Sequence, residues 1–305
     1  MQTKSSFLKS TAGMIITAVF CNFLWGSAFP CVKIGYQLFH VAADDSAAQI
    51  LFAGVRFTLA GILVILIGSL LSGQFLAAKK AVLPKIISLC LFQTVLQYLF
   101  FYIGLAHTSG VKSSIIEATS VFMAILISSL LFRMEKFTGK KILGCLLGFA
   151  GVVLVNLGGS ALSMGFQWNG EGFILISTVS YAFSTVLMKH FSRTENPVLL
   201  SGWQFIAGGL LMILSGFLAG GRLHVTSGAA YLMLLYLALI SSTAYSLWGL
   251  LLKYHPVSKV AVYGFTNPVF GVLLSAVFLH ENALGWQVLA ALPLVCIGIW
   301  CVNRT

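Results

Sequence analysis

Long apolar stretches separated by short polar segments run through the whole chain. Each holds roughly 20 residues, the length an α-helix needs to cross the hydrocarbon core of a bilayer. The pattern therefore predicts an all-α integral membrane protein without a separate soluble domain. Ten transmembrane helices are expected, at residues 12–36, 49–71, 82–106, 111–132, 138–157, 170–190, 198–219, 229–252, 258–279 and 284–303.

One stretch and its exit signal occur twice along the chain. The apolar run at 113–132 holds one internal charge, Glu117, and ends in a polar junction. A second apolar run at 258–279 ends in a similar junction. An apolar run that recurs together with the polar junction after it indicates that the two halves of the chain arose by duplication. The two junctions share the pattern Glu-x-x-(Thr/Leu)-Gly and run from Glu135 to Gly139 and from Glu281 to Gly285.

Two further matches occur in the same order. Residues 51–68 and 199–216 share eight identities in eighteen positions without a gap, and 25–29 falls against 181–185. We therefore expect two repeats, 1–157 and 158–305. Each would hold five helices, an odd number, so the second half begins on the opposite side of the membrane. The prediction is a 5+5 inverted repeat, an architecture in which similar halves exchange roles about a site near mid-depth.

Composition agrees with lipid as the solvent. Hydrophobic residues make up 59% of the 305 and charged residues only 8%, about a third of the usual share in soluble domains. The net charge of +11 then belongs to loops that face an anionic leaflet, and no nucleic-acid-binding pattern is present.

The basic residues predict the orientation in the membrane. With the N-terminus inside, 14 of the 18 Lys and Arg residues fall at or near the cytoplasmic side. Because cytoplasmic loops carry the excess of Lys and Arg, both termini are expected in the cytoplasm of a cell (plasma or inner) membrane protein. Four basic residues remain for the other side: Lys33, Arg56, Lys112 and Arg222.

The chain resembles a known family at this level. Ten spans in an inverted repeat, Trp25-Gly26-Ser27 in the first helix and the paired Glu-to-Gly junctions are similar to the drug/metabolite transporter superfamily, EamA branch. The resemblance implies secondary transport, often export, of amino acids, purines, drugs or related small metabolites. The sequence departs from the family at one point, since the helix proline found in both halves stands here only as Pro268, with Phe122 as its counterpart.

Ionisable residues inside the spans are the first candidates for a substrate site, because charges in lipid are costly and usually face a cavity or a partner. Arg56 offers a bidentate fork to a substrate carboxylate. Glu117 has two interpretations. It is a carboxylate that alternately holds a proton and a cationic substrate group, which makes it the candidate coupling residue, or it is a structural ion-pair partner of Arg56, Lys33 or Lys112.

Polar and aromatic residues within the spans complete the candidate site. Gln93 and Gln97 lie four apart, as do Tyr98 and Tyr102, so each pair shares a helix face. Hydrogen bonds between helices explain the glutamines as well as ligand contact does. Asn267 precedes Pro268, where a helix break would free backbone carbonyls. The predicted substrate-binding set is Trp25, Arg56, Gln93, Gln97, Tyr102, Glu117, Trp248 and Asn267.

The sequence fits two other classes of function less well than a transporter. A channel is the nearer alternative, although no ring of like charge or filter-like run is present. An intramembrane enzyme is disfavoured because no span contains an aspartate and neither HExxH nor G-x-S-x-G occurs. No catalytic residue, metal or cofactor is expected. The expected partners are a small-molecule substrate, protons as candidate coupling ions and the lipid bilayer, with monomer and homodimer both open.

Overall fold

In the computed structural model, the described residues are 7–105, 107–108, 110–156, 166–225, 227–278 and 286–304. Every element of regular secondary structure in these ranges is helical, which confirms the all-α prediction. In chain order they are α2 (Thr11–Leu38), α3 (Ser46–Ser72), η1 (Lys80–Val82), α4 (Leu83–Leu89), η2 (Cys90–Leu96), α5 (Gln97–Leu105), α6 (Gly110–Leu126), η3 (Ile127–Leu131), α7 (Gly139–Asn156), η4 (Trp168–Gly172), α8 (Phe173–Phe191), α9 (Pro197–Leu218), α10 (Gly228–Tyr254), α11 (Val257–Ala261), η5 (Val262–Phe265), α12 (Thr266–Phe278) and α13 (Trp286–Asn303).

The surface of the helices fits a membrane. Within the described residues, eight helical stretches are long and apolar enough to span a bilayer, and Leu289–Asn303 is a shorter apolar helix. Large apolar side chains face outward on them, and Leu70, for example, is 81% exposed. The protein is a multi-pass membrane protein. The helices overlap all ten predicted ranges, while the number of spans stays a prediction.

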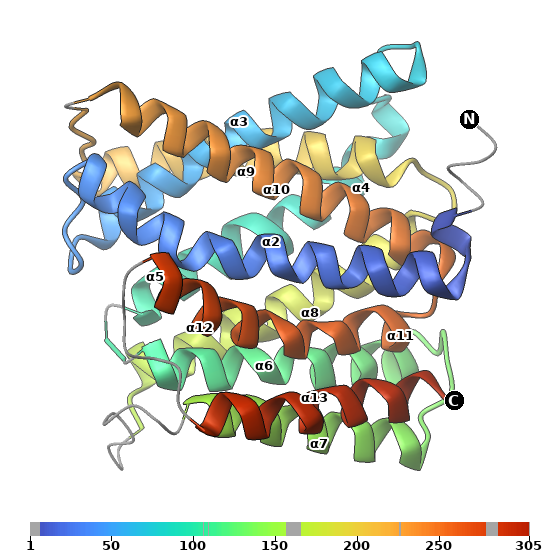
Figure 1. Ribbon diagram of the computed structural model, residues 1–305. Coiled ribbons are helices and arrows are strands. Elements are labelled where there is room, and N and C mark those ends of the chain that lie inside the picture. The colour runs from blue at the N-terminus through green and yellow to red at the C-terminus, as the bar shows by residue number, and fades with distance from the viewer. Residues whose placement is uncertain are drawn as a thin grey trace.

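The helices lie side by side along one bundle axis, with the start of α2 and the end of α13 at the same end (Figure 1). The helix pairs α3 with α9 and α7 with α13 pack closely, and each joins two predicted repeat mates. The pair α2 with α12 has α6 with α8 as its counterpart, and both pairs are in contact. A pseudo-two-fold relation between the predicted halves requires this pattern of neighbours.

Glycines allow the pairs α3–α9 and α7–α13 to approach closely. A Cβ on Gly54 of α3 would lie 2.9 Å from the carbonyl oxygen of Gly209 in α9, and one on Gly144 of α7 would lie 2.6 Å from the carbonyl oxygen of Gly298 in α13. Small residues at such contacts let backbones pack without a side chain between them. The side of α7 that carries Gly144 therefore packs against α13 of the same chain.

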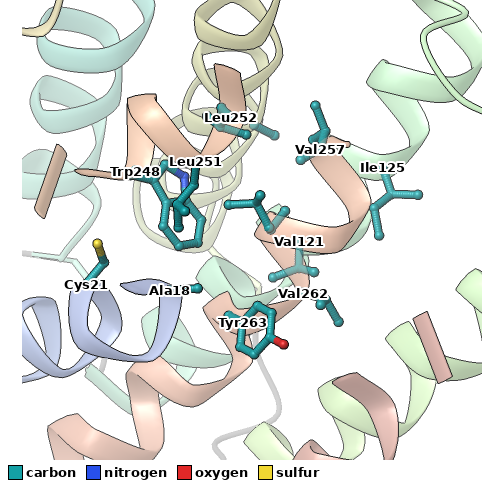
Figure 2. Packing of buried hydrophobic residues seen from close by; sticks show 14 of the residues in the cluster. Ala18, Cys21, Val121, Ile125, Trp248, Leu251, Leu252, Val257, Val262 and Tyr263 are labelled. Atoms are coloured by element: carbon teal, nitrogen blue, oxygen red, sulfur yellow. The ribbon is translucent and has the colours of Figure 1, made fainter. Parts of the chain in front are cut away.

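A buried apolar core joins the two predicted halves near the end of the bundle where the chain begins and ends. Figure 2 shows Trp248 and Leu251 of α10, Val257 of α11, Val262 of η5 and Val121 of α6 packed around one another. Because Val121 belongs to the first predicted half and the other four side chains to the second, this core holds α6 against α10, α11 and η5. All six cysteines are free thiols, four of them buried.

Candidate functional site

An aromatic cluster occupies the centre of the bundle. The Trp25 ring of α2 lies 5.1 Å from the rings of both Tyr245 and Trp248 of α10, in edge-to-face geometry. The Tyr245 hydroxyl is 3.0 Å from the hydroxyl of Tyr98 in α5. The indole Nε1 atoms of Trp25 and Trp248 are buried and have no hydrogen-bond partner in the described chain. The two indole N–H groups of this central aromatic cluster can therefore donate hydrogen bonds to a polar ligand.

A small cavity of about 20 Å³ adjoins the cluster, which is room for about one water molecule. The space is too small for a larger molecule in this conformation. The lining residues come from α6, α8, α10 and the α11–η5 segment and include Ser120, Val121, Tyr181, Thr185, Trp248 and Gly264.

Arg56 extends from α3 into the protein interior. The residue is 5% exposed, and its Nε and Nη2 atoms donate to the Ser241 hydroxyl of α10 at 3.2 and 3.1 Å. No carboxylate of the described chain lies within salt-bridge distance, and Nη1 donates to no described residue. A buried guanidinium without a counter-ion is strongly disfavoured unless an anion compensates it. The residue is thus placed to bind an anionic group.

Gln93, Gln97 and Tyr102 line the same interior. Gln93 lies in the π-helical segment η2, and such wide turns occur frequently at functional sites. Both glutamines are buried, and their Oε1 atoms have no hydrogen-bond partner among the described residues. Tyr102 is buried and interacts electrostatically with both Arg56 and Glu117. Of these three residues, Tyr102 is therefore the one near both Arg56 and Glu117.

Glu117 lies on the cavity face of α6. Ser120 and Val121, three and four residues on, share its face and line the cavity. The side chain is half-buried and forms no salt bridge within the described chain. Among the expected ion-pair partners, Lys112 instead binds Glu171 at 2.7 Å. Of the three partners considered for Glu117, Lys112 thus pairs with Glu171 in this structure, and the role of the Glu117 carboxylate stays a prediction.

The helix break expected at Asn267-Pro268 lies one turn earlier than the proline. Residues Val262–Phe265 form a 3₁₀ turn between α11 and α12. Pro268 has no N–H to donate to the Gly264 carbonyl four residues back, and its ring crowds that carbonyl. Gly264 lines the cavity, so the distortion borders the candidate site. Asn267 follows the turn, and its Oδ1 is buried without a partner in the described chain.

Glu135 links the predicted halves at one end of α6 and η3. Its carboxylate accepts from Ser128 Oγ at 2.7 Å and Lys141 Nζ at 2.6 Å, and from both the backbone N–H (3.1 Å) and the hydroxyl of Ser258 in α11. Burial alone would raise the pKa of Glu135, but the hydrogen bonds from Lys141, Ser258 and Ser128 and the charge of Lys141 outweigh it and hold the pKa below its ordinary value. The sequence marked Glu135 only as a repeat junction.

A second carboxylate links the halves at the opposite end of α6. Glu171 Oε1 accepts from Lys112 Nζ at 2.7 Å and from Thr108 Oγ1 at 2.8 Å, while Oε2 accepts from the Gln167 N–H at 2.8 Å. Glu171 is not among the residues predicted from the sequence, although its place at the start of a predicted span was a signal. We call these contacts the Glu135 clasp and the Glu171 clasp.

The comparisons with known proteins agree with this architecture. The EamA-like transporter family matches at residues 12–157 and 168–304. The chain belongs to the EamA-like transporter family. Like the drug/metabolite transporters it resembles, this EamA protein is a membrane transporter, and the family name points away from an enzyme.

Its relatives carry transporter names. The chain is 28% identical over 289 residues to "Uncharacterized transporter YvbV" of Bacillus subtilis, with 93% of this chain and 89% of the relative covered. It is 27% identical over 297 residues to "Probable amino-acid metabolite efflux pump" of Salmonella typhimurium, covering 91% and 90%. A crystal structure 18% identical in sequence superposes with a TM-score of 0.79 over 96% of both chains, which shows the same fold.

Proposed function

We propose that this EamA protein is a secondary active transporter that exports a small metabolite across the cytoplasmic membrane by alternating access between the halves 1–157 and 158–305. The main support for the proposal is that contacts between the two halves close both ends of the bundle, with the charged residues Arg56 and Glu117 between those ends. The Glu135 clasp and the Glu171 clasp each join one half to the other, at opposite ends of the helices that line the cavity. Opening one clasp at a time would expose the centre to one side of the membrane.

Arg56 is the proposed anchor for a substrate carboxylate. Its guanidinium is buried, is held by the Ser241 hydroxyl and has no carboxylate partner in the described chain. Charge-assisted, bidentate hydrogen bonds from arginine to a carboxylate are about twice as strong as neutral ones. Since Arg56 belongs to the first half and Ser241 to the second, an anion bound to Arg56 would lie where the two halves meet.

Glu117 is the proposed partner for a proton or for a cationic group on the substrate. Tyr102 lies near both Glu117 and Arg56, and we infer that the substrate carries both a carboxylate and an amine and binds beside this tyrosine. Trp25, Gln93, Gln97, Trp248 and Asn267 supply buried polar atoms without partners in the described chain. The name of the Salmonella relative, an amino-acid metabolite efflux pump, supports this choice of substrate.

A ligand-stabilisation screen tests the Arg56 anchor. Purified protein is melted with amino acids, purines and quaternary amines, because a compound that binds the folded state raises the melting temperature. In Arg56→Gln, compounds with a carboxylate should bind at least about tenfold more weakly, since a charged hydrogen bond contributes about 1.5–3 kcal/mol. Quaternary amines without a carboxylate should bind as before.

The matched control is Arg222→Gln, which removes one positive charge from an arginine that donates only to nearby backbone carbonyls. Arg222→Gln should leave every ligand shift unchanged. Unchanged binding of carboxylate compounds by a folded Arg56→Gln protein would refute the anchor.

A channel or facilitator is the second candidate. The cavity of about 20 Å³ and the clasps at both ends favour a mechanism in which the path is never open throughout. Counterflow separates the two: preloaded substrate accelerates uptake of labelled substrate by a carrier, whereas a channel shows no such acceleration.

A further inference from the structure

An apolar groove lies on the outside of the bundle between α2, α12 and α13. Its volume is about 450 Å³. Lining side chains such as Ile15 (40% exposed) and Trp300 (54% exposed) face outward, so the groove opens toward the surrounding lipid. It lies in the half of the bundle nearer the chain ends, because Ile15 is near the start of α2 and Trp300 near the end of α13. The lining includes Ile15, Val19, Phe270, Leu273, Cys296 and Trp300.

Each side of the groove is held by a close glycine contact. A Cβ on Gly26 would lie 2.5 Å from Phe270 Cβ, which shows how tightly α2 and α12 approach. The contact between Gly144 and Gly298 holds α13 against α7 in the same way. Because α12 and α13 are drawn to different neighbours, they touch only sparsely, whereas their counterparts α6 and α7 pack along each other. The groove between α12 and α13 therefore has no counterpart between α6 and α7 of the first half, within the described residues.

The end of the groove nearer the termini is cationic. Lys259 lies one helical turn before Tyr263, which lines the groove. The Arg304 guanidinium lies 4.2 Å from the ring centroid of Trp300. Neither residue forms a salt bridge in the described chain. Asn303, also in the lining, has a buried Oδ1 without a hydrogen-bond partner there.

We propose that this groove binds one acyl chain of an anionic phospholipid whose phosphate lies between Lys259 and Arg304. The volume is in the range of sites that hold a drug-sized molecule, and the lining is almost entirely apolar. Basic pockets between transmembrane helices attract anionic head groups, and the chain below the head group gains from burial against apolar side chains. The lipid would fill the space between α12 and α13 that protein fills between α6 and α7.

Native mass spectrometry of the full chain tests the acyl-chain site. Purified protein is titrated with phosphatidylglycerol and scored for bound lipid. Cys296→Trp places a large side chain in the groove, while Ile297→Trp adds the same side chain at the next residue, which is exposed but outside the lining. Cys296→Trp should bind one lipid about tenfold more weakly, because excluding even two methylene groups has that effect. Ile297→Trp should bind as the wild type does.

Charge variants test the head-group site. Lys259→Gln with Arg304→Gln should remove the preference for phosphatidylglycerol over phosphatidylcholine. Lys79→Gln with Lys80→Gln, which removes the same charge from exposed residues outside the groove, should keep it. An unchanged preference in the first pair overturns the head-group assignment.

Two results would overturn the acyl-chain site. One is equal lipid binding by folded Cys296→Trp and Ile297→Trp proteins. The other is a dimer mass that Cys296→Trp alone abolishes, which would assign the groove to a second copy of the chain. If Cys296→Trp fails to fold, Leu292→Trp, one turn away in the same lining, takes its place with the same expected outcome.

Discussion

Replacing Glu135 with glutamine should destabilise the protein by more than any other single charge removal at the same end of the bundle. Glu135 and Lys141 are 9% and 6% exposed, and their charged atoms are 2.6 Å apart. Glutamine keeps the shape and a hydrogen bond to Ser258 but leaves the Lys141 charge buried and unpaired. Removing one partner of a buried pair costs about 3–5 kcal/mol.

A second salt bridge supplies the control. Lys85 and Glu195 are also 2.6 Å apart, but they are 28% and 24% exposed. Exposed pairs contribute about 0–1 kcal/mol, so Glu195→Gln should have a small effect. The assay is denaturant unfolding in detergent. Glu135→Gln with Lys141→Met should recover much of the loss, because no unpaired charge remains.

The pH dependence gives an independent check on the Glu135 clasp. The pKa of Glu135 is lowered in the folded protein, so its stabilisation is present above the unfolded value of about 4.3 and is lost as the pH falls through the folded pKa. The stability difference between wild type and Glu135→Gln should therefore be constant near pH 7 and shrink only below about pH 4. A loss no greater than that of Glu195→Gln would refute the buried-clasp reasoning.

Two further predictions concern packing and orientation. Gly54→Ala should destabilise the protein by about 1–3 kcal/mol, because the new Cβ would lie 2.6 Å from the Ile213 backbone nitrogen across the α3–α9 contact. Gly228→Ala is the control and should not destabilise the protein, because its new Cβ would have no neighbour within 4 Å. Equal melting temperatures for the two variants would contradict the close α3–α9 contact. In a cysteine-free background, Ala78→Cys should be protected from an impermeant thiol reagent in intact cells and Ser227→Cys should react; labelling of Ala78→Cys from outside would reverse the orientation.

The helices could be predicted from the sequence because spanning length and apolar composition are local properties. The predicted start at residue 49 was three residues late, since α3 begins at Ser46, where Asp45 Oδ1 accepts from the Ala48 N–H at 2.8 Å. A helix cap of this kind involves residues close together in the sequence, so the start of α3 could have been predicted from Asp45.

Contacts between distant residues could not be predicted from the sequence. The charge of Lys112 was visible, but its binding to Glu171 instead of Glu117 depends on how α8 begins beside α6. The interaction of Glu135 with Ser258 likewise requires the two predicted halves to be packed together. Arg56 and Glu117 could be proposed as candidates because a charge in an apolar run is conspicuous without any structure. Glu281, in the second predicted repeat junction, lies outside the described residues.

Proton-driven transport by Glu117→Gln tests the central claim most directly. The wild type and the variant are reconstituted into proteoliposomes with a substrate found in the stabilisation screen, and both uphill accumulation under a pH gradient and counterflow without one are measured. If Glu117 carries the coupled proton, Glu117→Gln should keep counterflow and lose accumulation, because glutamine cannot release and rebind a proton. Accumulation by Glu117→Gln at the wild-type rate and with the wild-type pH profile would contradict the account.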